Sequence, residues 1–435
     1  MANLKPFQVV LLSVFGVLAL VGLFLFANFK GFGKNADQIG TVVIWGTIPQ
    51  KAVTPSLAEL KRLHKEFAKV SYSERQASSF DTDLANAIAS GSGPDLILIT
   101  QEQLVTEQSR LVIIPPATLS ERAFRDTYLP GFDIYLTESG TYGIPFVMDP
   151  LVMYYNRTIL ATAGIATAPT TWEAVTGLSP TLTQVNTAQT VERSTVALGT
   201  YGNIDQARAI LSLLFLQAGQ GMTARGVNGV RSTLLQNSTG ASGVSSTQSA
   251  LAFYTEFSNP AKTTYSWNRS LPSSRQMFVQ GDLALYLGYA SEQGNIRAAS
   301  PNLEFDMART PSPATATSRV TYGKAYAFAV PKASKNQKGA VATAFAFTGS
   351  DTLPALARAL GMAPGVRTML TPSTKDLYEP VYYPEALIAK GWLSPAPAAT
   401  DSVFAAMIDN VTSGRTTAGQ ALVAADQSLN AALGQ

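Results

Sequence analysis

The stretch Tyr142–Asn156 reads Tyr-Gly-Ile-Pro-Phe-Val-Met-Asp-Pro-Leu-Val-Met-Tyr-Tyr-Asn and decides how the fold is interpreted. Two apolar runs, Ile144–Met148 and Leu151–Tyr155, are rich in the branched and aromatic residues that suit a pleated, mostly buried surface. Each of its two prolines removes a backbone donor, and Pro150 biases Asp149 toward an extended conformation. We therefore expect an interrupted strand, instead of one regular central strand, that leaves one lobe and enters another.

Asp149 is the only charged residue between Glu138 and Arg157. A carboxylate among apolar residues is costly unless a partner pairs with it or water reaches it. We therefore expect Asp149 to line a wet crevice between two lobes. The alternative is a surface residue on a connection from a strand to a turn.

Composition narrows the function classes. The chain has 435 residues, which allows two lobes and an appendage, and 46% of them are hydrophobic. With a net charge of only +3 and no basic tract, the sequence indicates no nucleic-acid partner. One His and no Cys exclude disulfides, a thiolate nucleophile, a zinc site with Cys ligands and a cluster of His ligands. We expect neither a metal nor a cofactor.

The amino terminus carries the one long apolar segment. Val9–Ala27 is uncharged, and at about 20 residues such a segment can span a bilayer. We predict a transmembrane signal anchor at residues 7–29 and a linker at residues 30–40. A long cleaved secretory signal is the alternative, although Leu25 to Ala27 make a poor cleavage site.

The first part of the chain beyond the linker alternates strands and helices. Thr41–Trp45 and Asp95–Thr100 are short apolar runs, as expected of buried strands. Between them, Pro55–Val70 and Phe80–Ala89 have helical patterns. Continuous apolar strands separated by helices predict a parallel α/β sheet.

Aromatic residues fall at the ends of several predicted strands. In open α/β sheets, ligands bind beyond the carboxyl ends of the strands. Flat aromatic faces beside amides and carboxylates suit a neutral, hydroxyl-rich ligand. Together with polar neighbours and one aromatic residue in a loop, they give these candidate ligand-binding residues: Trp45, Gln101, Asp149, Tyr201, Asn203, Trp267, Tyr289 and Ser291.

The sequence gives little sign of catalysis. It has neither a Gly-x-Ser-x-Gly elbow nor a Walker loop, so we predict no catalytic residue and expect a non-enzyme. One alternative is a membrane-anchored glycoside hydrolase or other cell-wall enzyme that uses Asp149 with Glu292. Another alternative is that the protein binds ferric iron through the tyrosine pairs Tyr154–Tyr155 and Tyr382–Tyr383. A surface scaffold is a third interpretation.

Six short motifs resemble the extracellular solute-binding proteins of ABC importers, in the family that includes maltose-binding protein. The resemblance runs from about Thr41 to the end of the chain. Its motifs, in the family's order, are Thr41–Gly46, Gly93–Ile99, Tyr142–Pro145 with Tyr154–Asn156, Ala163–Ile165 with Pro169–Glu173, Phe278–Ala284, and Ser413–Thr417.

The resemblance implies two α/β lobes that close on a ligand in the cleft between them. It assigns residues 41–148 and 320–370 to lobe 1, and residues 149–319 and 371–435 to lobe 2. Asp149, the pair around Tyr201, and Tyr289 match ligand positions of the family by local motif. Many sugar-binding relatives have Trp where this chain has Tyr289, and the chain has no lipobox Cys.

The resemblance also predicts the function and the location. We expect a monomer that captures a neutral solute, with carbohydrates as the first choice, and passes it to an ABC permease. The anchor would be single-pass in the cell membrane, and the bulk of the chain would be extracellular. Lys5 precedes the predicted span, whereas Lys30 and Lys34 follow it, so the charges alone do not give this orientation.

Overall fold

The computed structural model describes residues 39–188, 190–226, 229–236 and 244–434. The predicted anchor at residues 7–29 lies outside these ranges, as does most of the predicted linker. Within the described ranges, no helix is long and apolar enough to cross a membrane.

The strands are short, apart from two. They are β1 (Val42–Gly46), β2 (Val70–Glu74), β3 (Leu96–Thr100), β4 (Leu136–Thr137), β5 (Gly140–Thr141), β6 (Ile144–Asn156), β7 (Gln184–Val185), β8 (Val191–Val196), β9 (Thr223–Gly226), β10 (Gly229–Ser232), β11 (Leu283–Tyr289), β12 (Phe305–Ala308), β13 (Thr321–Ala329), β14 (Ala363–Pro364) and β15 (Ala389–Lys390).

Helices separate most of these strands. They are α2 (Gln50–Leu63), α3 (Phe80–Ala89), α4 (Gln101–Glu107), α5 (Glu121–Thr127), α6 (Arg157–Thr162), α7 (Trp172–Leu182), α8 (Ala207–Gln217), α9 (Ser246–Glu256), α10 (Ser274–Gln280), α11 (Gln293–Ala299), α12 (Gln337–Phe347), α13 (Leu353–Leu360), α14 (Glu379–Ile388), α15 (Pro397–Thr412) and α16 (Ala418–Ala432), with a 3₁₀ helix, η4, at Pro130–Tyr135.

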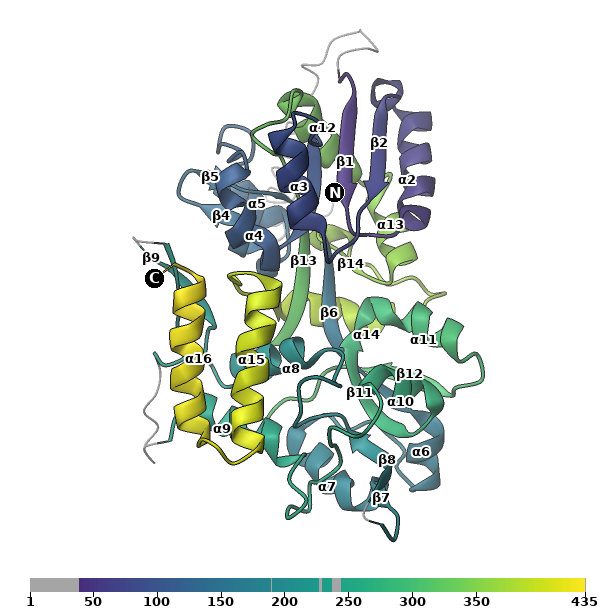
Figure 1. Ribbon diagram of the computed structural model, residues 1–435. Helices are drawn as coiled ribbons and strands as arrows, with labels where there is room; N and C mark the ends of the chain where they lie inside the picture. The colour runs from purple at the N-terminus through teal and green to yellow at the C-terminus, as the bar shows by residue number, and fades with distance from the viewer. Residues whose placement is uncertain (1–38, 189, 227–228, 237–243, 435) are drawn as a thin grey trace, which may run out of the picture.

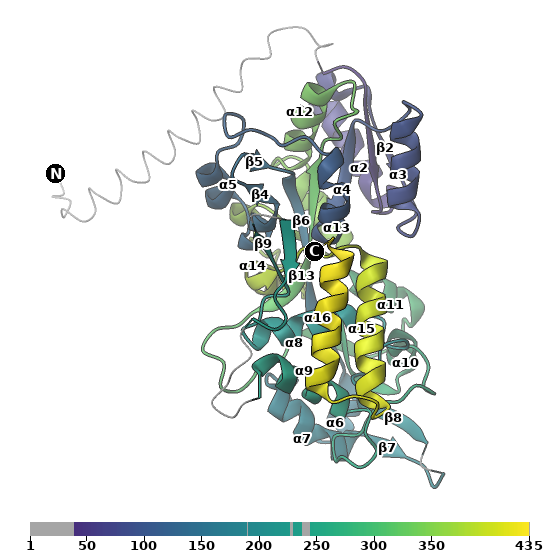
Figure 2. The same ribbon diagram turned by 60° about the vertical axis from the view of Figure 1, so that its left-hand side comes forward.

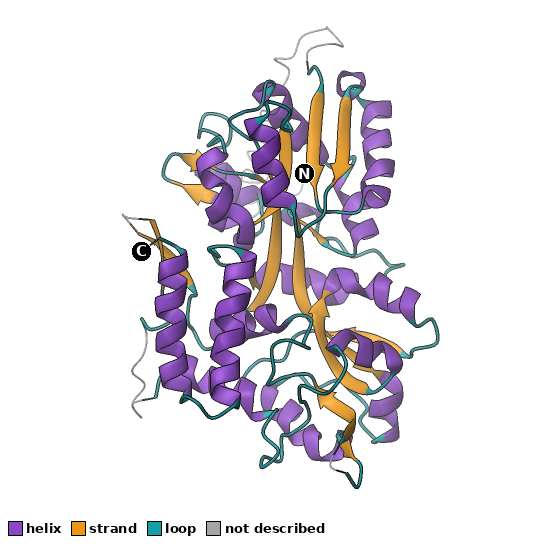
Figure 3. Cartoon of the chain, viewed as in Figure 1, coloured by secondary structure: helices purple, strands orange, loops and turns teal. Residues whose placement is uncertain are grey.

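One large sheet connects the whole molecule, in the order β2-β1-β3-β13-β6-β11-β8-β7. Figure 1 shows β1 and β2 with α2, α3 and α12 at the top, and β8, β11 and β12 with α6, α7 and α10 at the bottom. Strand β3 pairs with β1 and belongs to the top group. We call these groups the upper lobe and the lower lobe. Strands β6 and β13 run from one lobe into the other, as the orange strands in Figure 3 show.

The predicted strand order in the upper lobe is confirmed in part. Strands β1 and β3 pair in parallel, as the apolar runs predicted. The helix expected at Pro55–Val70 ends instead at Leu63, and β2 follows and pairs in parallel with β1. Val70 and Tyr72 are buried while Ser71 between them is exposed, so this stretch has the period of two that a strand requires.

The prediction of an interrupted strand at Tyr142–Asn156 was wrong, because β6 is continuous over thirteen residues. Its two prolines lie at positions where pairing with the neighbouring strands does not require a backbone N–H. Pro145 lies beside a register shift in the pairing with β13. On the other edge, β14 pairs with Val147 and Met148, and β11 pairs with residues from Leu151 onward, so Pro150 lies where one partner strand replaces the other.

Helices α15 and α16 pack side by side along the lower lobe, as Figures 1 and 2 show. Thr417 caps α16: its hydroxyl accepts a hydrogen bond from the backbone N–H of Gln420, and the side chain of Gln420 accepts one from the N–H of Thr417. Replacing Thr417 with Ala leaves the backbone N–H of Gln420 without its side-chain acceptor, although the N–H of residue 417 can still donate to the Gln420 side chain. We expect T417A to lose about 1 kcal/mol of unfolding free energy in urea. Ser402→Ala, at an exposed position inside α15, is the control and should change stability by less than about 0.5 kcal/mol.

Candidate ligand site between the lobes

Gln101 is the first residue of α4 and anchors the upper lobe to β13. Its side-chain Nε2 donates to the carbonyl oxygen of Gly323 (3.0 Å), and its Oε1 accepts from the N–H of Ala325 (2.8 Å). The side chain is fully buried. Its position directly after β3 is as predicted, but its amide is already bound by the strand next to it.

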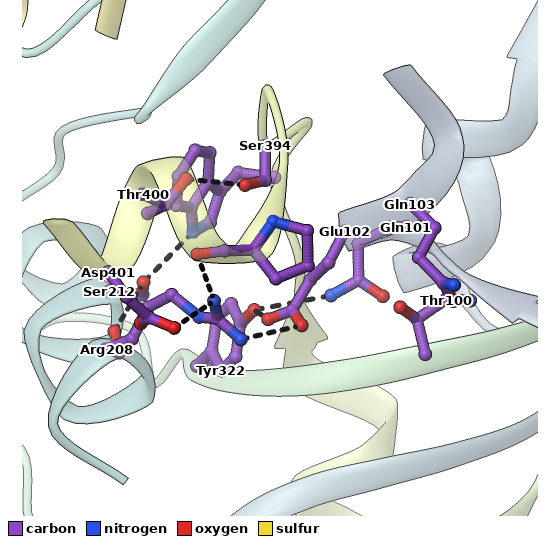
Figure 4. Close-up of polar contacts among 12 residues, drawn as sticks. Thr100, Gln101, Glu102, Gln103, Arg208, Ser212, Tyr322, Ser394, Thr400 and Asp401 are labelled. Atoms are coloured by element: carbon purple, nitrogen blue, oxygen red, sulfur yellow. Dashed lines mark hydrogen bonds and ion pairs between the residues drawn. The ribbon is translucent and has the colours of Figure 1, made fainter. Parts of the chain in front are cut away.

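The neighbouring Glu102 joins the two lobes, as Figure 4 shows. One carboxylate oxygen lies 3.0 Å from the guanidinium of Arg208, which comes from α8 in the lower lobe. The other accepts a hydrogen bond of 2.7 Å from the hydroxyl of Tyr322 on β13. Burial acts to raise the pKa of Glu102, but the charges of Lys324 and Arg208 and the hydrogen bond from Tyr322 outweigh it and hold the pKa below its ordinary value.

Arg208 continues this network within the lower lobe. Its guanidinium donates to Asp401 of α15 (3.2 Å) and to the carbonyl oxygen of Pro397 (3.0 Å). Asp401 in turn accepts a hydrogen bond of 2.5 Å from the hydroxyl of Tyr201. Residues from α4, α8, α15 and the segment after β8 therefore meet at one polar interface. We call Glu102, Arg208, Tyr201, Tyr322 and Asp401 the interlobe network.

Asp149 lies near the middle of β6, opposite Lys324 of β13. Its two carboxylate oxygens accept hydrogen bonds from Ser291, one from the backbone N–H (3.1 Å) and one from the hydroxyl (2.6 Å). Only 2% of Asp149 is exposed. Burial raises its pKa to about 7, against the lowering effects of the Ser291 hydrogen bonds and of Lys324. The carboxyl group therefore gains or loses a proton near neutral pH.

Tyr289, at the end of β11, lies beside the same lysine. The Nζ atom of Lys324 is 4.5 Å from the centroid of the Tyr289 ring, a cation–π distance. Lys324 also acts on both Asp149 and Glu102 electrostatically. Lys324 thus connects the Asp149 group to the interlobe network that contains Tyr201.

The other candidates lie elsewhere or face inward. The indole Nε1 of Trp267 donates to the side-chain oxygen of Asn203 (3.1 Å), and Trp267 is fully buried. Asn203 donates to the carbonyl oxygens of Asn268 and Leu271. In the upper lobe, the guanidinium of Arg75 covers Trp45 at 3.7 Å from the ring centroid. These side chains use their polar groups or ring faces within the protein.

Sequence reasoning identified Asp149 but missed four other charged residues of the site, which are Glu102, Arg208, Lys324 and Asp401. One signal was present. Arg208 is the only charged residue in α8, whose sequence is otherwise Ala, Ile, Leu, Phe, Ser and Gln. A lone guanidinium at the start of an apolar helix needs an acidic partner, by the same reasoning that singled out Asp149. Its partner, Glu102, lies in the other lobe, and no local sequence pattern identifies it.

Two lobes that share the strands β6 and β13 and meet at a polar interface define an α/β fold of the periplasmic-binding-protein type. The sequence model of one family, described as bacterial extracellular solute-binding protein, matches residues 50–348. The chain belongs to that family. No curated protein sequence matches the chain.

Solved structures share this fold at low sequence identity. The cyclic alpha-maltosyl-1,6-maltose binding protein of Arthrobacter globiformis has a TM-score of 0.73 and 18% identity, covering 91% of this chain and 99% of its own. A cyclo/maltodextrin-binding protein complexed with maltotetraose has a TM-score of 0.70 and 13% identity, covering 92% and 98%. The maltose/maltodextrin-binding domain of Bdellovibrio bacteriovorus, bound to maltotriose, has a TM-score of 0.67 and 15% identity, covering 91% and 100%.

Proposed function

We propose that the protein captures a neutral carbohydrate between its lobes and delivers it to an ABC importer. The observation that carries this proposal is the interlobe network, where hydroxyl, carboxylate and guanidinium groups from both lobes meet beside Tyr289. Sugar hydroxyls make hydrogen bonds with the same groups, and sugar C–H faces stack on aromatic rings. The family and the saccharides bound to structural neighbours support this choice of ligand.

In the proposed mechanism, the two lobes move relative to each other. Residues 41–148 and 320–370 would move against residues 149–319 and 371–435, with β6 and β13 as the hinge. A ligand closes such a cleft only if it binds the closed state more tightly than the open one. A transmembrane anchor at residues 7–29 would keep the protein at the outer face of the cell membrane, next to its permease.

The alternative of a glycoside hydrolase is less well supported. Such an enzyme needs one carboxyl group to protonate the leaving oxygen and another to attack or to activate water. Ser291 already binds both oxygens of Asp149. Glu292 accepts from the hydroxyl of Tyr286 (2.6 Å), the N–H of Tyr289 (2.8 Å) and the side chain of Gln206 (2.9 Å). Binding without turnover fits these two occupied carboxyl groups better.

Calorimetry with a panel of ligands tests the proposal. We expect maltotriose or another neutral oligosaccharide to bind and to raise the unfolding temperature, whereas amino acids, polyamines and metal ions do not. A chromogenic glycoside should remain uncleaved. No response to any saccharide would remove the proposed function, and turnover that requires Asp149 and Glu292 would favour the hydrolase.

Tyr289→Ala should weaken saccharide binding by about tenfold or more, because the ligand loses the ring face that Lys324 leaves uncovered when the lobes open. Titration calorimetry measures the affinity, and circular dichroism checks that the variant is folded. The matched control is Tyr155→Ala, a half-buried tyrosine on β6 that lies next to Asp306 of β12 and outside the interlobe network. Equal affinities in Y289A and the wild type would place the ligand away from Tyr289.

A further inference from the structure

A pocket lies between the lobes, apart from the interlobe network. Its volume is about 550 Å³. The upper lobe contributes η4, the lower lobe contributes Leu216 and the run Gly219–Thr223, and the segment Leu387–Leu393 forms the remaining wall. We call it the side pocket.

The segment Leu387–Leu393 separates the side pocket from the interlobe network. A Cβ atom added to Gly391 would lie 2.7 Å from Nε2 of Gln101, so this glycine packs directly against the first residue of α4. Neither Asp149 nor any member of the interlobe network lines the side pocket. The two places are therefore distinct sites.

The side pocket has apolar walls and an excess of positive charge. Leu136, Leu216 and Ile388 are among its apolar lining residues, and Arg225 and Lys390 are its two cations. The one acidic residue in the lining, Asp133, already pairs with Arg125 at 3.2 Å.

Arg225 has only neutral partners among the described residues. Its guanidinium donates to the side-chain oxygen of Gln108 (3.3 Å) and to the carbonyl oxygen of Ile134 (3.4 Å), and it lies 5.9 Å from the ring centroid of Tyr142. Both hydrogen bonds are longer than is usual for a guanidinium. Lys390 is exposed and makes no ion pair with any described residue. The pocket thus offers two cations to an incoming anion.

Gln220 adds an unfilled acceptor to the same lining. Only 2% of this residue is exposed, and its Nε2 donates to the carbonyl oxygens of Gly221 and Thr233. Its Oε1 has no hydrogen-bond partner among the described residues. Buried side-chain oxygens are nearly always paired, so this oxygen would gain a partner if the Gln220 side chain turned it toward a donor in the pocket.

We propose that the side pocket binds a small organic anion: a carboxylate or sulfonate on an aromatic or alkyl body, with a hydroxyl or N–H donor. The acidic group would pair with Arg225 and Lys390, and the apolar body would cover Leu216 and Ile388. The donor would bond Oε1 of Gln220 once that buried side chain turned toward the pocket. This site goes beyond the capture of a carbohydrate and does not depend on it.

The probe is 1-anilinonaphthalene-8-sulfonate, which carries an aromatic body, one sulfonate and one N–H. We expect the folded protein to bind one molecule per chain, with saturable fluorescence and a higher unfolding temperature. Arg225→Gln should weaken binding by about tenfold, since it removes the charge that pairs with the sulfonate. N-phenyl-1-naphthylamine, which lacks the sulfonate, should bind the wild type more weakly.

A second variant and a control make the outcome decisive. Leu387→Glu places a negative charge in the lining at a side chain that is 41% exposed, so the fold should tolerate it and binding should fall at least as far as in R225Q. Arg231→Gln removes one charge from the other strand of the same β9–β10 hairpin, outside the lining, and should bind like the wild type. Wild-type affinity in both R225Q and L387E, or fluorescence that never saturates, would overturn the proposal.

Discussion

Arg208→Gln will separate the lobes and lower the unfolding free energy by about 3 kcal/mol, the cost of leaving one member of a buried ion pair without its partner. Arg208 is the lower-lobe group that pairs with Glu102 of the upper lobe at 3.0 Å. Only 7% of the Glu102 side chain and 18% of the Arg208 side chain are exposed, so little water reaches Glu102 while the lobes stay in contact, and the unpaired carboxylate favours their separation. Lys324 stays near Glu102 and limits the loss.

Two measurements test the prediction for R208Q. Urea unfolding gives the free energy, and small-angle X-ray scattering gives the radius of gyration, which should increase in R208Q without any added ligand. The control is Arg269→Gln, which breaks the pair with Asp409 at 2.7 Å, where the side chains are 59% and 41% exposed. Exposed pairs contribute about 0 to 1 kcal/mol, so R269Q should stay close to the wild type in both measurements.

A double variant separates the pair from its surroundings. If Glu102 and Arg208 stabilise each other, E102Q combined with R208Q will cost less than the two single losses together, because no unpaired buried charge remains. Additive losses, or an R208Q protein as compact and stable as R269Q, would show that the pair does not hold the lobes together. Scattering reads lobe separation directly, so this result does not depend on which solute binds.

Local sequence patterns predicted much of the fold. Apolar runs placed β1 and β3, and the six ordered motifs led to the family to which the chain belongs. The errors came from tertiary context. Pro145 and Pro150 argued against a single strand, but β6 has different partners along its length and needs no donor at those positions.

In the candidate site, too, local sequence patterns identified some residues, whereas contacts between distant elements could not be predicted. Asp149 stood out because a lone charge among apolar residues requires an explanation, and the structure gives it Ser291 as a partner. Strand-end position alone was a weaker guide. Gln101 directly follows β3 but is fully buried and bound by β13, and the guanidinium of Arg75 covers Trp45 near the end of β1. Contacts between elements far apart in the chain, such as Glu102 with Arg208, arise only when the lobes meet.

Asp149→Asn will remove a pH dependence from the stability of the protein. Burial raises the pKa of Asp149 from its ordinary value of 3.8 to about 7 in the folded state. The folded protein therefore holds this proton more tightly than the unfolded chain does. Its contribution to stability is fully present below about pH 4 and is lost as the pH rises through 7, and a difference of this size corresponds to about 4 kcal/mol.

The comparison of the variant with the wild type isolates this one group. Glu292 also has a raised pKa and Glu102 a lowered one, but both are present in the two proteins. Asn keeps the shape of the protonated carboxyl group, so its side-chain oxygen can accept from the N–H of Ser291 while its amide donates to the hydroxyl.

Urea unfolding at pH 5, 6, 7 and 8 provides the measurement. D149N should gain stability relative to the wild type at each step, and the gain should level off above about pH 8. Asp126→Asn changes a side chain that is 72% exposed, and its stability should run parallel to that of the wild type. If D149N also ran parallel to the wild type, Asp149 would be ionised across this whole range, and water or a cation would have to reach its carboxylate in the folded protein.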